Sequence, residues 1–288
     1  MIIIKYLNKI TKDNPFFFTS DYKYTINRFK KTFNYSPDLK HPKTFNEKIN
    51  WRKLFIRKNI FKIFADKIEV RKYVEDIMGN EILVKVFQVT DKPETIDYSN
   101  LPHSFIIKAS HGSGWNKIVI NKSLLNEKEI NDYFTNILKL DYYYLGREWC
   151  YKNLPPRLII EELLLDNNGA LPVDYKFFCF NGVVRFIQVD FNRFTNHTRN
   201  LYDPNFEVID CQYHYPLSTL FINPPENFDN LKKIASKLSK DLDFIRVDLY
   251  SINNRVYFGE LTCYPENGFG KFQPPVFDLA FGDYWKVN

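Results

Sequence analysis

Apolar residues recur at helical spacing in three separate segments of the chain. This pattern predicts helices over residues 44–63, 126–140 and 229–242, each with one apolar face. A fourth helix is expected after Asp66, which is a residue type suited to the N-cap position. Lys67 would then lie in the first turn, where a cation opposes the helix dipole unless it faces solvent or an anion offsets the cost.

Shorter apolar runs, several with alternating polarity, predict β-strands. Asn181–Gly182 is one of the strongest short-range turn signals and predicts a hairpin. A second hairpin is expected around Asn253. The predicted strands cover residues 82–87, 104–109, 158–165, 175–180 and 183–190 and both arms of the segment 244–262. Because helices are mixed with antiparallel hairpins, the α+β class fits better than a doubly wound parallel sheet.

The hairpin at residues 244–262 carries one carboxylate on each predicted strand, Asp248 and Glu260. With the turn near Asn253, we expect both carboxylates on the same face of neighbouring strands. Two carboxylates that close repel one another unless a cation or a proton lies between them. Oxygen ligands at this separation suit Mg²⁺. The simpler alternative is a surface hairpin with two solvated acids.

The composition allows a sizeable hydrophobic core. The chain has 288 residues, of which 44% are apolar and 17% aromatic, so it suffices for one large domain or two modest ones. The four cysteines have no paired spacing, which argues against a zinc site and against a disulfide scaffold. The simplest interpretation is buried, reduced cysteines in a cytoplasmic protein. They are Cys150, Cys179, Cys211 and Cys263.

The positive charge is concentrated at the N-terminus. Residues 1–40 hold eight Lys or Arg and three Asp, a net charge of +5 out of +6 for the whole chain. The same segment is rich in aromatics, which suggests peripheral contact with membrane headgroups or with an acidic glycan. A helical subdomain that packs its aromatics inward is the alternative. The first apolar run is too short for a spanning helix or a signal peptide. Since no basic stripe crosses the rest of the chain, we expect no nucleic-acid partner.

A glycine-serine loop follows the predicted strand that ends near Lys108. Glycine lets backbone amides approach a phosphate closely, and a lysine at the strand end supplies a point charge. The spacing matches neither the Walker pattern nor a dinucleotide fingerprint, and an ordinary turn is the alternative. His111 is a further candidate for contact with phosphate or substrate. The loop residues are His111, Gly112, Ser113, Gly114 and Trp115.

Two adjacent acids, Glu161 and Glu162, interrupt the apolar run at residues 158–165. Acids in an apolar strand are costly unless they have partners. One of the two could point to solvent on an edge strand. The functional interpretation is a connector whose backbone groups are offered to a nucleotide base and ribose.

A polar group follows in the segment that contains Asp174, Lys176, Arg193, His197 and Arg199. Arginine recognises carboxylate and phosphate with two hydrogen bonds. For each of these residues a surface charge is the alternative. No Ser or Cys partner is evident for His197, so a catalytic triad is not supported.

The order of these features resembles the ATP-grasp superfamily, from about residue 63 to residue 270. Further segments look like the TupA-like branch, named for teichuronopeptide biosynthesis. They are Lys43–Ile49, Ala65–Lys67, His111–Asn116, Glu148–Trp149, Ile160–Glu162, Asp174–Gly182, Arg246–Tyr250 and Phe258–Thr262. The resemblance implies an α+β ATP-grasp fold with two subdomains, residues 63–155 and 156–288, that clasp ATP behind an N-terminal helical region at residues 1–62.

The resemblance also implies roles for individual residues. Lys67 and Lys108 would contact the nucleotide phosphates, and the loop from His111 to Trp115 would close over them. The adenine would be lined by Glu161, Glu162, Leu163 and Leu164, and Asp174 would reach the ribose. Asp248, Glu260 and Thr262 would bind Mg²⁺, although Thr262 stands where the superfamily usually has Asn. Lys176 would contact the nucleotide and, with Arg193 and Arg199, supply charge for catalysis.

The activity implied is ATP- and Mg²⁺-dependent ligation of a carboxylate to an amine through an acyl phosphate. The branch points to an amino acid or amine joined to a uronic acid in a cell-surface polysaccharide, by a cytoplasmic enzyme at or near the inner face of the membrane. Three alternatives remain open at this stage. They are a glycan kinase, a glycosyltransferase of the same pathway, and a non-enzymatic adaptor that binds acidic glycans or membrane.

Overall fold

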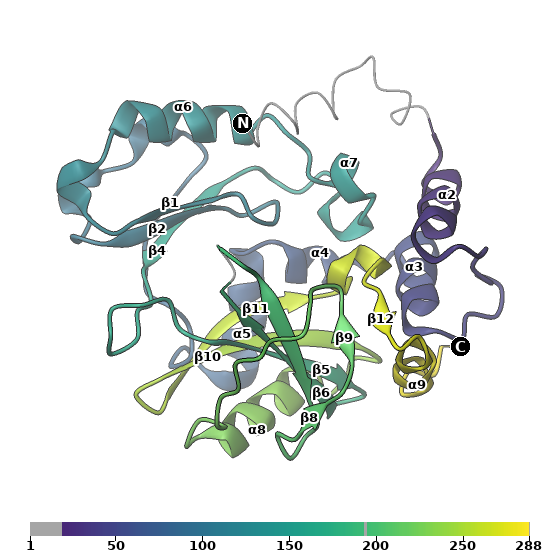
Figure 1. Ribbon diagram of the computed structural model, residues 1–288. Helices are drawn as coiled ribbons and strands as arrows, with labels where there is room; N and C mark the ends of the chain where they lie inside the picture. Colours follow the sequence, from purple (N-terminus) through teal and green to yellow (C-terminus); the bar gives the residue numbers. More distant parts are fainter. Residues whose placement is uncertain (1–18, 193–194, 288) are drawn as a thin grey trace.

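The computed structural model describes residues 19–192 and 195–287 (Figure 1). Residues 1–18, which include much of the basic aromatic segment, and Arg193 lie outside this range. The α-helices are α2 (Asp21–Phe33), α3 (Phe45–Phe55), α4 (Asn59–Ala65), α5 (Glu69–Met78), α6 (Glu127–Ile137), α7 (Tyr143–Gly146), α8 (Phe228–Leu238) and α9 (Val276–Asp283). The short 3₁₀ helices are η2 (Pro93–Thr95), η3 (Tyr98–Asn100), η4 (Lys122–Leu124), η5 (Trp149–Tyr151) and η6 (Pro265–Gly268).

The strands form two main sheets and one small ribbon. The first sheet has the order β1-β4-β2-β3, with β1 (Val86–Thr90), β2 (Phe105–Ala109), β3 (Asn116–Val119) and β4 (Leu158–Glu162). The second sheet has the order β11-β10-β5-β6-β7-β8. Its strands are β5 (Asp174–Phe180), β6 (Val183–Phe191), β7 (Thr198–Tyr202), β8 (Val208–Ile209), β10 (Ile245–Ile252) and β11 (Arg255–Thr262). The ribbon pairs β9 (Gln212–Tyr213) with β12 (Phe272–Gln273).

Local sequence explains the tightest connections. Asn181 and Gly182 both have positive φ, as do Asn253 and Asn254, which is the geometry of two-residue hairpin turns. Helix α3 begins at a capping box, in which the Glu47 amide donates to the Thr44 hydroxyl and the Thr44 amide donates to the Glu47 carboxylate.

Each main sheet has its own hydrophobic core. In the first sheet, alternate residues such as Phe105 and Ile107 pack against Ile130 and Phe134 of α6, which lies across one face of this sheet (Figure 1). Lys108 and Glu161 occupy the opposite face, because side chains alternate along β2 and β4. The second sheet packs one face against α4, α5 and α8.

Helices α3 and α9 cover one end of the other face of the second sheet. The Phe45 ring centroid lies 6.0 Å from that of Phe178 and 5.1 Å from that of Phe244. The Phe281 ring stacks on Phe186 at 4.1 Å. Since Lys176 precedes Phe178 by two residues and shares its face, the aromatic cluster borders a polar area on the same sheet.

The buried polar side chains of α3 hold carbonyl groups from the C-terminal part of the chain. Lys48 donates to the carbonyls of Gly282 and Trp285, both at 2.8 Å. Arg52 donates to the Phe244 carbonyl at 2.8 Å and to the Asp243 carboxylate at 2.7 Å. The N-terminal helical region therefore shares its core with the second sheet.

Several predicted boundaries differ from the structure. The predicted helix over residues 44–63 is two helices, because the chain is extended at Ile56. Residues 82–85 are not a strand, and β1 begins at Val86. The fourth helix begins at Glu69, so Lys67 precedes it, although the Asp66 carboxylate still accepts from the Ile68 amide at 2.9 Å.

The sheets divide the chain differently from the predicted subdomains. Residues 158–162 fall on the far side of the predicted boundary at 155/156, yet β4 pairs with β1 and β2 of the first sheet. Phe64, Val70 and Val74 fall in the predicted first subdomain but pack in the core of the second sheet. The connection therefore crosses between the cores twice, near residues 85 and 163.

Candidate functional site

Ionisable side chains form a row across the second sheet. Asp248 on β10 is directly opposite Glu260 on β11 and opposite Lys176 on β5. Lys176 is in turn opposite Gln188 on β6. Residues that oppose one another in an antiparallel sheet share a face, so all four side chains lie on the face that α4, α5 and α8 leave uncovered.

A β-bulge at Gly259 brings the two carboxylates together. Asp248 pairs with Glu260 and Leu249 pairs with Phe258, so Gly259 is the extra residue on β11. A Cβ at this position would lie 3.0 Å from the Asp248 carbonyl oxygen. Glycine is therefore required by close approach of the neighbouring strand.

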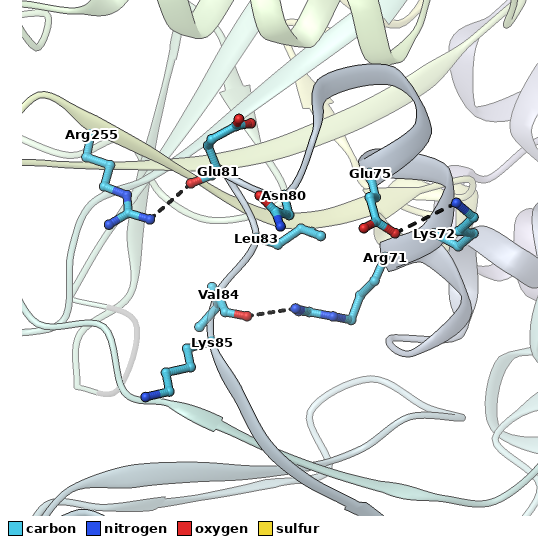
Figure 2. Close-up of a pocket in the computed structure, with 9 residues that line it drawn as sticks. All are labelled: Arg71, Lys72, Glu75, Asn80, Glu81, Leu83, Val84, Lys85 and Arg255. Atoms are coloured by element: carbon cyan, nitrogen blue, oxygen red, sulfur yellow. Dashed lines mark hydrogen bonds and ion pairs between the residues drawn. The ribbon is translucent and has the colours of Figure 1, made fainter.

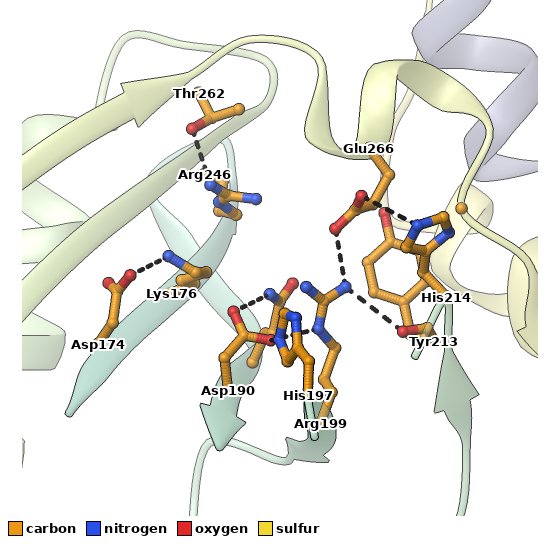
Figure 3. A network of polar contacts seen from close by, with 12 residues as sticks. Asp174, Lys176, Asp190, His197, Arg199, Tyr213, His214, Arg246, Thr262 and Glu266 are labelled. Carbon is orange, nitrogen blue, oxygen red and sulfur yellow. Dashed lines mark hydrogen bonds and ion pairs between the residues drawn. The ribbon is translucent and has the colours of Figure 1, made fainter. Parts of the chain in front are cut away.

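Arg246 binds all three predicted metal-binding side chains at once, and its contact with Thr262 is drawn in Figure 3. Its Nε lies 2.7 Å from Asp248 Oδ1, and its Nη2 lies 2.8 Å from Glu260 Oε1 and 3.0 Å from Thr262 Oγ1. The Thr262 hydroxyl also donates to Glu260 at 2.6 Å. The three predicted side chains are thus gathered at one point around a cation.

The same oxygen atoms fit a magnesium ion. Asp248 and Glu260 supply hard carboxylate oxygens on adjacent strands, and Thr262 adds a hydroxyl, which are ligand types that Mg²⁺ accepts. The Arg246 guanidinium already supplies positive charge to this group. Because Asp248 and Glu260 need positive charge nearby, they would hold Mg²⁺ next to the Arg246 guanidinium.

Burial and the nearby cations act in opposite directions on the two carboxylates. Burial raises the pKa of Asp248 to about 6, because desolvation outweighs the attraction of Arg246 and Lys176. Glu260 also feels desolvation, but Arg246 and Lys176 prevail and lower its pKa to about 2. The two pKa values shift in opposite directions because Glu260 and Asp174 also repel the charge of Asp248, whereas the Thr262 hydroxyl and Lys67 further stabilise the charge of Glu260.

Lys176 lies between two carboxylates. Its Nζ is 2.8 Å from Asp248 Oδ2 and also donates to Asp174 on the same strand. Lys176 and Asp174 are both buried. The structure therefore places the predicted catalytic lysine and the predicted ribose ligand together, directly beside the predicted metal group (Figure 3).

The uncovered face of the first sheet presents Glu161 between two cations. Lys108 Nζ lies 2.7 Å from Glu161 Oε2, and Arg71 Nη1 of α5 lies 3.1 Å from Glu161 Oε1. Arg71 also donates to the Val84 carbonyl at 2.8 Å. Glu161 is thus partnered inside the protein, and Arg71 links it to the connection between the two sheets.

The residues after Glu161 complete the predicted adenine segment. Glu162 is exposed, and its amide donates to the Lys85 carbonyl at 2.9 Å. Leu163 is buried and Leu164 is half-buried. The two connections between the sheets are therefore hydrogen-bonded to one another beside this segment.

Lys67 contacts the glycine-serine loop. Its ammonium donates to the Gly112 carbonyl, and its amide donates to the Ser110 carbonyl at 3.2 Å. Burial lowers the pKa of Lys67, and Lys108 adds to this effect. His111 and Trp115 are buried with ring centroids 5.2 Å apart. Ser113 and Gly114 form the exposed tip of the loop.

Arg199 lies at the other side of the second sheet and is buried between two acids (Figure 3). Its Nε is 2.5 Å from Asp190 Oδ1, and its Nη1 is 2.8 Å from Glu266 Oε1. His197 Nε2 approaches Asp190 at 3.1 Å. Two carboxylates thus bind the Arg199 guanidinium in this arrangement. Arg193 lies outside the described residues.

Sequence reasoning missed Arg246, Asp190, Glu266 and Glu148 as candidate site residues. Alternation alone would have placed Arg246 on the face of Asp248, since the two are separated by one residue. Nothing local to Glu266 indicates that it meets Arg199, which is 67 positions away in the chain.

A surface hollow of about 820 Å³ lies apart from this face (Figure 2). It contains none of the predicted metal or catalytic residues. Two lining residues connect the hollow to the predicted adenine segment, Arg71 through Glu161 and Lys85 through the amide of Glu162. The hollow is lined by Arg71, Lys72, Glu75, Asn80, Glu81, Leu83, Val84, Lys85 and Arg255.

Several features of this structure are together typical of an ATP-grasp protein. They are the two main sheets, the carboxylates of Asp248 and Glu260, the lysines Lys67 and Lys108, and the glycine-serine loop. The TupA-like ATP-grasp family model matches residues 47–286. The chain therefore belongs to the TupA-like ATP-grasp family, which confirms the predicted superfamily, branch and fold.

Among solved structures, the fold is similar to ATP-grasp ligases at low identity. The D-alanine–D-alanine ligase of Bacillus anthracis complexed with ATP is 17% identical, with a TM-score of 0.41 over 70% of this chain and 54% of that one. The phosphoribosylamine–glycine ligase of Thermotoga maritima is 12% identical, with a TM-score of 0.44 over 76% and 55%. This chain thus spans little more than half the length of these proteins. No curated protein matches the sequence.

Proposed function

We propose that this protein joins a carboxylate to an amine at the expense of ATP, through an acyl phosphate and with release of ADP. The observation that carries the proposal is the row formed by Glu260, Asp248 and Lys176, with Arg246 bound to both acids. In a TupA-like ATP-grasp protein, the acids of this row would bind the metal ion, and Lys176 and Arg246 would attract the negatively charged triphosphate.

The nucleotide would lie between the two sheets. Lys67 and Lys108 are proposed to contact the phosphates, with the loop from His111 to Trp115 above them. Glu161 to Leu164 are proposed to line the adenine, and Asp174 to reach the ribose. Support comes from the contacts of Lys67 with this loop and of Lys108 with Glu161.

When bound, ATP and Mg²⁺ supply the phosphoryl group and a Lewis acid at its oxygens. Asp248, Glu260 and Thr262 are the proposed ligands of the metal. Lys176 and Arg246 then provide fixed positive charge beside the transferred group, where charge develops. Both side chains are held by carboxylates, so little reorganisation is needed during the reaction.

We propose a positioning role for Arg199 in place of the predicted catalytic role. The contacts with Asp190 and Glu266 support a positioning role, because its guanidinium is buried and doubly paired. A role of Arg193 in binding substrate stays a proposal from the sequence.

The finer proposal concerns the substrates and the place of action. We propose an amino acid or amine as acceptor and a uronic acid as donor, in cell-surface polysaccharide assembly. We also propose that the protein is cytoplasmic and that its basic N-terminal segment draws it to the inner face of the membrane. The TupA-like branch supports this pathway. Within the described residues, no helix is both long and apolar enough to cross a membrane.

The test is ADP release measured with panels of acids and amines. The proposal expects ADP release that requires one acid and one amine together with Mg²⁺, and loss of that activity in Glu260→Gln. Phosphorylation of a hydroxyl compound without any amine requirement would instead indicate a kinase. Thermal stabilisation by nucleotide sugars but not by ATP would point to a glycosyltransferase.

A further inference from the structure

The loop that follows the metal-binding strand has an unusual backbone. Glu266 and Asn267 of η6 have φ of 48° and 56°, and Gly268 has φ of 71°. Left-handed geometry at non-glycine residues costs of order 1 kcal/mol or more and persists only where the surroundings impose it. Here η6 begins three residues after Thr262, so the loop borders the site.

Three side chains from two elements, β7 and α3, impose this geometry. Arg199 of β7 binds the Glu266 carboxylate at 2.8 Å. Lys53 of α3 donates to the Asn267 carbonyl at 3.0 Å and to its side-chain oxygen at 2.7 Å. Asn50 donates to the Gly268 carbonyl at 2.7 Å. The loop is thus fixed from both sides before any substrate arrives.

Glu148 lies against the same loop and lacks a polar partner. Its carboxylate makes no hydrogen bond or ion pair with any residue in the described part of the chain. The Cβ position of Gly146 is 3.0 Å from Glu148 Oε2 and would be 2.2 Å from Asn267 Nδ2, and Asn267 donates to the Gly146 carbonyl at 2.8 Å. Glu148 therefore borders η6, on the connection between α7 and η5.

The charged groups around Glu148 come from four elements. Lys53 of α3 and Arg28 of α2 attract its charge, while Glu266 of η6 and Glu260 of β11 repel it. Lys53 and Arg28 both lie over the ring of Phe269, at 4.4 and 4.2 Å from its centroid. Glu148 is thus within electrostatic range of the proposed metal ligand but is directly paired with neither cation.

We propose that Glu148 binds the ammonium group of the acceptor and removes its proton, so that η6 forms the acceptor side of the site. This inference rests on the proposed ligation. The incoming amine arrives as an ammonium cation. Glu148 offers it a partly exposed carboxylate without a partner, beside the fixed loop η6 and near the metal group.

Transfer of the acyl group from the acyl phosphate to the amine conserves atoms and charge. The acceptor R′–NH₃⁺ gives one proton to the Glu148 carboxylate and becomes R′–NH₂. The amine nitrogen then attacks the acyl carbon of the donor acyl phosphate, a C–N bond forms, and the C–O bond to phosphate breaks. Phosphate leaves with the second amine proton, and Glu148 later returns its proton to water.

The environment of Glu148 suits proton transfer at neutral pH. Burial raises its pKa to about 7, against the opposing attraction of Lys53 and Arg28. A general base works best when its pKa lies near the working pH. Tyr151 and Cys150 of η5 also face this carboxylate, and their own pKa values are raised by burial, so neither carries charge at neutral pH.

The test compares two nucleophiles in Glu148→Gln. Hydroxylamine is unprotonated at neutral pH and traps an acyl phosphate as a hydroxamate, whereas glycine, ethanolamine and ammonium chloride must each lose a proton. Glucuronate, galacturonate and N-acetylglycine serve as donors. Glu94→Gln is the matched control, since Glu94 is exposed in η2. Thermal unfolding with and without Mg²⁺ and ATP checks that each variant is folded.

We expect Glu148→Gln to form hydroxamate at the wild-type rate and to lose about 10²–10⁴-fold in kcat/KM for the amines. Glu148→Asp should recover part of that loss. The pH profile for amines should lose its acidic limb, the rise in rate as Glu148 ionises near pH 7, in Glu148→Gln only. Unchanged amide formation, or equal loss with both nucleophiles, would overturn the inference. Absence of hydroxamate in the wild type with every donor would overturn the ligation itself, and the inference with it.

Discussion

Asp248 lies directly opposite Glu260, although regular pairing from the turn would place it opposite Gly259. The pair Ile252–Arg255 closes a two-residue turn, and uninterrupted pairing from there would turn Glu260 to the covered face of the sheet. The extra residue on β11, Gly259, returns Glu260 to the face that carries Asp248. The metal group therefore depends on the bulge.

Gly259→Ala should damage both stability and metal binding. The added Cβ would lie 3.0 Å from the Asp248 carbonyl oxygen and 3.1 Å from the Tyr250 ring. We expect the free energy of unfolding to fall by about 1–3 kcal/mol, as for other overpacked positions. We also expect weaker Mg²⁺-dependent binding of a non-hydrolysable ATP analogue by calorimetry. Wild-type values in both measurements would show that the bulge tolerates a side chain.

Arg246→Met should make the fold dependent on divalent cations. Without the guanidinium, Lys176 is the cation left beside Asp248. Breaking the buried Arg246–Asp248 pair costs about 3–5 kcal/mol. Mg²⁺ at 100 times its Kd would return about 2.7 kcal/mol. Thermal unfolding with and without Mg²⁺ should thus show a larger Mg²⁺-induced rise in Tm for the variant than for the wild type. An equal rise would contradict the assignment of these acids to the metal.

Asp190 should contribute stability that is lost in acid. Burial opposes its ionisation, but Arg199 and Lys176 prevail and hold its pKa well below the usual range. A depressed pKa gives stability that is present above the unfolded value of about 4 and is lost as the pH falls below it. Asp190→Asn should therefore lower Tm at pH 7 and flatten the fall of Tm between pH 4 and pH 2. Asp132→Asn on exposed α6 is the control, with the wild-type slope expected.

Lys108→Met tests the nucleotide side of the site. Loss of the ammonium removes a proposed phosphate contact and leaves Glu161 with Arg71 alone. A hydrogen bond to a charged group is worth about 1.5–3 kcal/mol, so affinity for Mg²⁺–ATP should fall by about one to two orders of magnitude. Lys139→Met, at an exposed lysine, should bind as the wild type does. Calorimetry that finds equal affinities for both variants would remove Lys108 from the site.

Phe45→Ala tests whether the N-terminal helices are part of the same cooperative unit. The Phe45 ring contacts rings from β5, β6, the segment before β10, β12 and the C-terminus. Truncation of a fully buried phenylalanine costs about 3–5 kcal/mol. Urea unfolding should retain a single transition at a lower midpoint. Two separate transitions would mean that residues 19–62 unfold independently of the second sheet.

Much of the site could be predicted because strands alternate with a period of two. Asp248, Lys176 and Lys108 stand in short strands whose apolar neighbours define the buried face. The bulge could not be predicted, since Gly259 in a strand indicates a bulge or a close approach without giving the register. The shared face of Asp248 and Glu260 was thus correct only because the chain adds one residue.

The polar side chains of α3 show a different limit. Asn46, Lys48, Asn50, Arg52 and Lys53 look like an exposed helix face in the sequence, yet all are buried. Their partners are mostly backbone carbonyls near residues 244 and 267–285. A carbonyl has no sequence signature, so composition gave no sign that this helix belongs inside the molecule.

These contacts also set the order in which the chain can fold during synthesis. Helix α3 leaves the ribosome early, but the carbonyls that satisfy Lys48 belong to Gly282 and Trp285, more than 230 residues later. At about 5–20 residues per second, this interval lasts on the order of ten seconds or more. The nascent chain must therefore carry an unfinished second core until residues 282–285 have been added.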